Sequence, residues 1–157
     1  MAYAERTGVP ISRSQQQIQD MVQKAGAKKY GTLYDGPSAI IAFVLRDRQI
    51  KFTLTLPDPE GFRYTNSWEQ ACRSKWRSLY LVIKAKLEAV ESGIATFDEE
   101  FLAWVVTPGG LTVGQRVIPD MQVRAAISRA DALSEEGPDG ATYYILKVGV
   151  DLSFYDV

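Results

Sequence analysis

The chain has 157 residues, of which 46% are apolar and 24% are charged, and its formal net charge is −1. These values are typical of a globular domain with its own core, and they argue against a disordered chain. The sequence has no histidine, no apolar run of membrane-spanning length, and a single cysteine, Cys72, so imidazole catalysis, a membrane helix, an intrachain disulfide and a cysteine metal cluster are all excluded.

The first third of the chain predicts an arm, a short helix and a three-stranded antiparallel meander. Gly8 and Pro10 oppose regular structure in residues 1–11, which we expect to form the arm. Ser14 followed by Gln17 matches a capping box, and Gly26 is a natural helix stop. The apolar residues of this predicted helix recur at helical spacing: Ile18, Met21, Val22 and Ala25.

Three strands are expected over residues 28–34, 38–46 and 49–57. Asp35-Gly36 is a hairpin signal, and Asp47-Arg48 is expected to form the second tight turn. The middle segment, SAIIAFVLR, is apolar throughout, which predicts a central strand covered on both faces. The third segment alternates strictly between apolar and polar residues, as a strand with one core face does.

A long helix is predicted over residues 67–92, with Gly93 after its end. Its apolar stripe includes Trp68, Cys72 and Trp76, so Cys72 is expected to be a buried hydrophobe rather than a nucleophile. Small residues gather away from that stripe and would let another helix approach closely. We expect an oligomer or partner interface at this small-residue ridge: Ala71, Ser74, Ser78, Ala85 and Ala89.

The rest of the chain predicts more helix and then strands. Thr96 and Glu99 form a second capping box, and Pro108 ends the helix that they begin. A further helix is expected to about residue 132, disturbed at Pro119, followed by strands in residues 141–156. The prediction is therefore one α+β domain over residues 1–157, with residues 12–65 forming helix and meander and residues 66–132 forming the helical part.

The two halves of the chain carry opposite charge. Residues 1–86 hold 14 Lys and Arg against 7 Asp and Glu, a net of +7, whereas residues 87–157 hold 4 against 12, a net of −8. This asymmetry favours either a surface for a polyanion or two halves that attract each other. The candidate nucleic-acid-binding residues are Arg73, Lys75, Arg77, Lys84 and Lys86 of the long helix, Lys28, Lys29, Arg46, Arg48 and Lys51 of the meander, and the aromatic residues Tyr30 and Tyr34.

An internal role for the same cations stays open. In that case the cations solvate the edges of the long helix, or they pair with Glu88, Glu91 and the acidic residues 98–100. The three adjacent acids do not converge on one metal ion, because neighbouring helical residues point about 100° apart. Helix capping explains them, and no metal or cofactor is expected.

Three passages resemble a family of small accessory proteins of tailed bacteriophages and prophages: AYAERTGVPIS, WRSLYLVIKAKLEAVESGIATFDEEFLAWVV and GGLTVGQRVIP. The resemblance covers residues 2–119 and is strongest over residues 75–119, where Asp98 replaces the usual third acid of the family. It implies an accessory role in the host cell and supplies no catalytic residues. The final segment, ATYYILKVGVDLSFYDV, departs from the proline-rich ending of the family.

Together these features predict a non-enzymatic phage accessory protein in the host cytoplasm that binds nucleic acid, and more specifically single strands. The alternative is a protein-interaction module that inhibits or modulates a host defence or replication protein, and we expect it to assemble as a homo-oligomer. An acidic second half that mimics nucleic acid would suit that role. No membrane association is expected.

Overall fold

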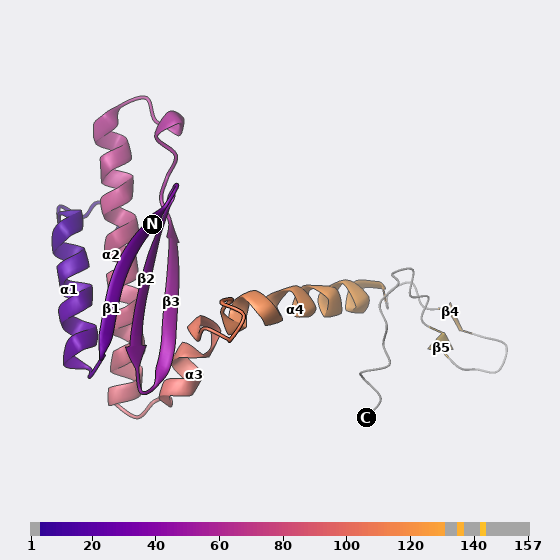
Figure 1. Ribbon diagram of the computed structural model, residues 1–157. Helices are drawn as coiled ribbons and strands as arrows, with labels where there is room; N and C mark the ends of the chain where they lie inside the picture. Colours follow the sequence, from indigo (N-terminus) through magenta and orange to yellow (C-terminus); the bar gives the residue numbers. More distant parts are fainter. Residues whose placement is uncertain (1–3, 131–134, 137–141, 144–157) are drawn as a thin grey trace. The chain divides into compact units, whose positions relative to one another are not determined.

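The computed structural model describes residues 4–130, 135–136 and 142–143 (Figure 1). The contacts divide the chain into two compact units, residues 1–114 and 115–157, and each is described by itself. The single domain expected from the chain length stays a prediction.

The first unit is an antiparallel sheet covered on one face by two helices. Its elements are α1 (Ile11–Lys24), β1 (Lys29–Asp35), β2 (Ser38–Leu45), β3 (Arg48–Thr55), the 3-10 turn η1 (Pro59–Gly61), α2 (Thr65–Glu91), α3 (Phe97–Phe101) and the 3-10 turn η2 (Leu102–Trp104). The strands follow the order β1-β2-β3, and α1 lies beside α2 (Figure 1). The α+β class and the three-stranded meander are confirmed.

The core lies between this sheet and the two helices. Its apolar side chains come from alternate positions of the strands and from helical positions three and four apart, which is why both elements present one continuous apolar face. The largest buried members are Trp76, Phe43, Phe52, Phe101, Ile18, Ile41, Ile50 and Ile83. Cys72 is buried beside them, and burial raises the pKa of its thiol, so it packs as a hydrophobe.

The central strand β2 is covered on one face only. Ala39, Ile41, Phe43 and Leu45 are buried, whereas the residues between them are intermediate in exposure. The expectation of a strand covered on both faces is therefore wrong. A continuous apolar run does not distinguish a doubly covered strand from one whose second face is open and only shielded by its neighbours.

The second hairpin turn lies one residue earlier than predicted. Arg46 and Asp47 occupy it with φ values of 49° and 60°, and Arg48 already belongs to β3. A two-residue hairpin turn with positive φ at both central residues is a type I′ turn. Its backbone twist matches the right-handed twist of the flanking strands. Asp accepts this conformation more readily than Arg, so Arg46 is held in a strained backbone position.

Helix α1 begins before the predicted capping box. Pro10 is its N-cap residue and makes no side-chain cap, and Ser14 lies inside the helix. Ser14 is fully buried, and its Oγ has no hydrogen-bond partner. The Ser14 capping prediction is thus wrong, because the carbonyl of Pro10 already accepts from the Ser14 N–H at 3.1 Å, so the helix begins one turn before Ser14. Gly26, with φ of 100°, follows the end of the helix as predicted.

The second capping box is confirmed. The Thr96 hydroxyl accepts from the Glu99 N–H, and the Glu99 carboxylate accepts from the Thr96 N–H at 2.7 Å. The helix that follows is shorter than expected, because Val105 forms a bridge with Ile50 of β3. The side chain of Trp104 stacks on Phe52 with ring centroids 4.5 Å apart, which fixes this return to the sheet.

Helix α4 (Val113–Ala130) begins at the end of the first unit and continues through Pro119. In the second unit, β4 (Glu135–Glu136) pairs antiparallel with β5 (Thr142–Tyr143). The rest of the strand predicted over residues 141–156 lies outside the described residues. Among the helices of the described part, none combines the length and the apolar character needed to cross a membrane.

Candidate functional site

The charge asymmetry of the sequence largely disappears in the folded first unit. Residues 1–114 contain 14 Lys and Arg and 12 Asp and Glu, so the unit carries a net charge of +2. The acids of residues 88–100 account for this change, because they belong to the same compact unit as the basic first half. A net charge of +2 gives little general attraction for a polyanion.

Two of the predicted nucleic-acid contacts are held by the acids around α3. The Nε of Arg48 lies 3.4 Å from the Asp98 carboxylate. The Nζ of Lys86 donates to the main-chain oxygen of Glu100 at 2.8 Å and lies 3.3 Å from its carboxylate. These cations connect β3 and α2 to α3, as the alternative of internal pairing predicts.

The other cations of the meander are also mostly engaged. Lys28 pairs with Asp47 at 3.1 Å, and Lys51 donates to the carbonyl oxygen of Gly110 at 2.7 Å. The guanidinium of Arg46 lies 5.5 Å from the centre of the Phe97 ring. Lys29 is exposed, and no ion pair or hydrogen bond of its side chain is found among the described residues.

The cations of α2 lie on two sides of the helix. The guanidinium of Arg73 lies 3.7 Å from the carboxylate of Glu69 and donates to the side-chain oxygen of Gln70. Arg77 donates to the Gln17 side chain of α1 at 2.7 Å and lies over the Tyr80 ring at 4.2 Å. Lys84 is exposed on this side, whereas Lys75 is exposed on the other. The cations of α2 therefore do not form one continuous row of accessible charges, because Arg73 and Arg77 have partners within the unit and Lys75 lies on the other side of the helix.

The two predicted aromatic platforms lie on β1 and take part in local bonds. Tyr30 is half-buried, its hydroxyl lies 3.3 Å from the Thr32 hydroxyl, and burial raises the pKa of its phenol. Tyr34 is 57% exposed, and its hydroxyl accepts from Gln15 at 2.7 Å. Only Tyr34 leaves much of its ring available to a ligand.

The small-residue ridge of α2 is partly occupied by the arm. The side chain of Gln70 donates to the carbonyl oxygens of Glu5 and Thr7, which places the arm beside the first part of the ridge. Ala71 and Ser74 line a shallow hollow there, and Ser78 and Ala89 are half-buried. Ala85 is exposed, so the open part of the ridge is short.

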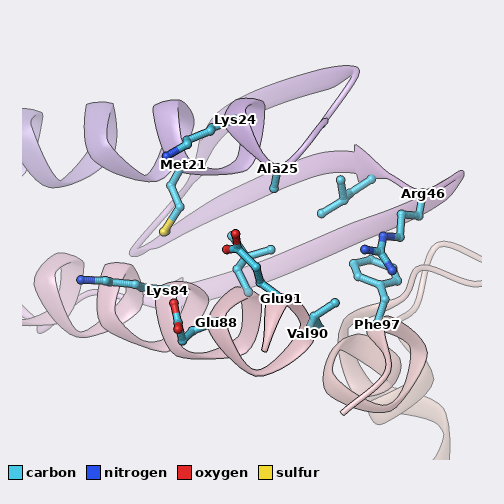
Figure 2. A pocket seen from close by; sticks show the side chains of 11 residues that line it. Met21, Lys24, Ala25, Arg46, Lys84, Glu88, Val90, Glu91 and Phe97 are labelled. Atoms are coloured by element: carbon cyan, nitrogen blue, oxygen red, sulfur yellow. The ribbon is translucent and has the colours of Figure 1, made fainter. Parts of the chain in front are cut away.

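A groove forms where α1 and α2 end beside the β2–β3 turn (Figure 2). It has a volume of about 400 Å³ and is enclosed by α1, α2, the turn and the first residue of α3. Figure 2 shows Met21 reaching in from α1 while Lys24 lies along that helix, and Glu88, Val90 and Glu91 come from α2. The apolar residues that line the groove are Met21, Ala25, Leu45, Leu87, Val90 and Phe97.

Charged groups of both signs surround this apolar lining. Lys24, Arg46 and Lys84 supply three cations, and none of them pairs with an acid among the described residues. Glu88 and Glu91 supply two carboxylates. In Figure 2 the Lys84 side chain extends along α2 away from Glu88, while the Arg46 guanidinium covers the Phe97 ring. This arrangement suits a ligand with an apolar part and an adjacent charge.

Arg46 and Lys84 were predicted as binding residues from the sequence. Their position in one groove with Met21, Lys24, Leu45 and Phe97 was not predicted. Hydrophobic periodicity identifies the apolar face of each helix, but it does not tell which ends of two helices meet. The local signal that bears on the groove is that Met21 and Leu87 are apolar helix residues, and both are only partly buried against the core in the structure.

Comparisons with protein-family models, curated proteins and solved structures gave no match. The resemblance to phage accessory proteins therefore stays an expectation from the sequence. In the part of the chain that the structure describes, no group of three or more Cys, Asp or Glu side chains could hold a metal ion.

Proposed function

We propose that the first unit is a non-enzymatic protein-interaction module whose groove between α1 and α2 receives a short segment of a partner protein. The observation that carries the proposal is the composition of the groove, with apolar side chains inside and charges around them. Protein interfaces combine an apolar centre with a polar rim in this way. A phosphate backbone instead requires a row of accessible cations.

The chemistry of the groove supports a particular kind of segment. A volume of about 400 Å³ accommodates one or two large apolar side chains of a ligand. Lys24, Arg46 and Lys84 outnumber Glu88 and Glu91, which favours an acid next to that apolar anchor. We therefore infer a partner segment in which Leu, Met or Phe is flanked by Asp or Glu.

The resemblance to phage accessory proteins supports a host defence or replication protein as the owner of this segment. Binding would then inhibit or modulate the host protein in the cytoplasm of the infected cell. The near-neutral charge of the first unit is compatible with selective docking, because a neutral surface is not drawn to every nucleic acid in the cell.

Selection from a random peptide library on the purified, nuclease-treated chain tests the proposal. We expect enrichment of peptides with an apolar anchor beside an acid. Lys84→Glu and Lys24→Glu should each weaken the selected peptide about tenfold, which corresponds to 1.4 kcal/mol. Lys75→Glu is the matched control, because it reverses another exposed cation of α2 that lies outside the groove. A selected peptide that binds all these variants equally would refute the groove as its site.

Nucleic acid is the second candidate ligand, and it is favoured by the three cations at the groove that lack acidic partners. Titration of a fluorescent single-stranded oligonucleotide at low and moderate salt distinguishes it from the peptide. Binding that falls steeply with salt and is lost in Lys84→Glu would assign the groove to phosphate recognition. Absence of binding at low salt would remove this candidate.

A further inference from the structure

The outer edge of β1 is an unprotected sheet edge. In the described part of the chain β1 pairs with β2 alone, and that pairing runs unbroken from Lys29 to Asp35. The strand contains no proline, and six of its seven residues are exposed. The opposite edge of the sheet is different, because Val106 donates to Gln49 of β3 and Val105 pairs with Ile50. Open edges of this length are templates for another strand.

The backbone groups that β1 offers to a partner follow from its register with β2. Asp35 and Ser38 flank a two-residue turn, so they form a hydrogen-bonded pair, and such pairs alternate along an antiparallel ladder. The Val44 carbonyl is directed toward β1, as its place in such a pair requires, and it accepts from the Lys28 N–H. The N–H and C=O groups of Tyr30, Thr32 and Tyr34 are therefore directed away from β2.

The sequence of β1, KYGTLYD, is complementary to itself when two copies run antiparallel with Thr32 at the centre. In this register Lys29 of each copy lies opposite Asp35 of the other, and Tyr30 lies opposite Tyr34. Opposite charges, aromatic pairs and a Thr–Thr pair are all favourable cross-strand neighbours. The centre falls on a residue whose backbone groups point outward, as a two-fold axis in this register requires.

The side chains on the two faces of β1 fit the same register. Leu33 is 63% exposed on the open face of the sheet, and in the paired copies it lies beside Gly31 of the other chain. A Cβ added at Gly31 would meet no atom within 4 Å, so this position has room for the leucine. On the helix side, a groove of about 560 Å³ between α1 and β1 is lined by Gln15, Gln16 and Gln19, which offer donors and acceptors.

We propose that two copies of this chain pair through β1 and join their sheets into one antiparallel sheet across a two-fold axis. The occupant of the edge is a second copy, because an antiparallel copy centred on Thr32 supplies the opposite charge to each end of the strand, Asp35 to Lys29 and Lys29 to Asp35. This surface is separate from the groove between α1 and α2, and the inference stands without the proposed function.

Sedimentation equilibrium of the full chain at several concentrations measures this association. The wild-type chain should form a dimer. Thr32→Pro should be monomeric and still folded by circular dichroism, because it removes an N–H that β2 does not use. A wild-type chain that stays monomeric, or a dimer with the same dissociation constant in Thr32→Pro, would overturn the proposal.

Charge reversal tests the register without proline. Lys29→Asp and Asp35→Lys should each weaken the homodimer about tenfold or more, because like charges then face each other twice. An equimolar mixture of the two variants should restore a heterodimer, since each pair again contains one Asp and one Lys. Lys75→Glu should leave the dimer unchanged. A mixture that associates no better than either variant alone would reject the register.

Discussion

The ammonium of Lys86 in α2 is held twice by Glu100 of α3, through the main-chain oxygen at 2.8 Å and the carboxylate at 3.3 Å. Both side chains are largely shielded, with exposures of 22% and 27%. The Lys86 ammonium also lies 6.0 Å from the centre of the Phe101 ring. Lys86, which was predicted from the sequence to bind nucleic acid, therefore holds α3 against α2.

Replacing Lys86 by methionine should lower the free energy of unfolding by about 1 to 3 kcal/mol, because hydrogen bonds to a charged group are lost while the apolar stem is kept. Lys75→Met is the matched control on the same side of α2, where the lysine is exposed and has no partner among the described residues. Its effect should stay within about 0.5 kcal/mol. Urea unfolding measures both, and equal losses would contradict the structural role of Lys86.

Ser14→Ala should stabilise the chain by about 1 kcal/mol or more. The Ser14 hydroxyl is buried without a hydrogen-bond partner, and alanine removes this cost while favouring the helix. The capping box predicted from the sequence requires the opposite sign, because loss of an N-cap side chain costs about 1 kcal/mol. Thermal and urea unfolding of the two proteins therefore decide between the two positions of the helix start. A destabilised Ser14→Ala would favour the cap.

Local sequence signals predicted the elements of the first unit better than their ends. Strict alternation predicts one buried face of β3, and the helical period predicts one buried face of α2. In each element the buried residues lie on the predicted face. The Thr96 capping box is a contact within four residues, so sequence spacing is enough to predict it. Pro10 begins α1 although Ser14 has the more familiar capping pattern, since several residues compete for that role.

The candidate site was harder to predict because it depends on tertiary arrangement. The acids nearest in sequence to Arg48 and Lys86, Asp47 and Glu88, do not pair with them. Their partners come from residues 98–100, which return to the sheet and to α2. The groove likewise combines Met21, Leu45 and Phe97 from three separate elements. Net charge computed along the chain therefore gave a misleading picture of the folded surface.

Arg46 should tolerate glycine better than alanine. Its φ of 49° strains any residue with a Cβ, whereas glycine adopts this conformation freely. Both substitutions lose the contact of the guanidinium with Phe97, so the difference between them reports the backbone strain. We expect Arg46→Gly to be more stable than Arg46→Ala by about 1 kcal/mol in urea unfolding. Equal stabilities would place the turn in another conformation.

Glu99 should make the stability of the chain sensitive to acid. Hydrogen bonds from the Thr96 backbone and hydroxyl hold the pKa of the Glu99 carboxyl below its ordinary value of 4.5. Because the folded-state pKa is lowered, the stabilisation is present above the unfolded pKa and is lost as the pH falls through the folded value. The free energy of unfolding of Glu99→Gln should therefore be lower than that of the wild type at about pH 7, and the two values should converge at lower pH.

Urea unfolding of both proteins across this range measures the effect, and carbon-detected NMR titration of the Glu99 carboxyl measures its pKa directly. Glu91→Gln is the control, since Glu91 is an exposed carboxylate without a hydrogen bond among the described residues. Its free energy of unfolding, compared with the wild type, measures the effect of removing an exposed carboxylate as such. A Glu99 pKa at or above 4.5 would show that the carboxylate does not cap α3 in solution, and the gap between wild type and Glu99→Gln would then not narrow in acid.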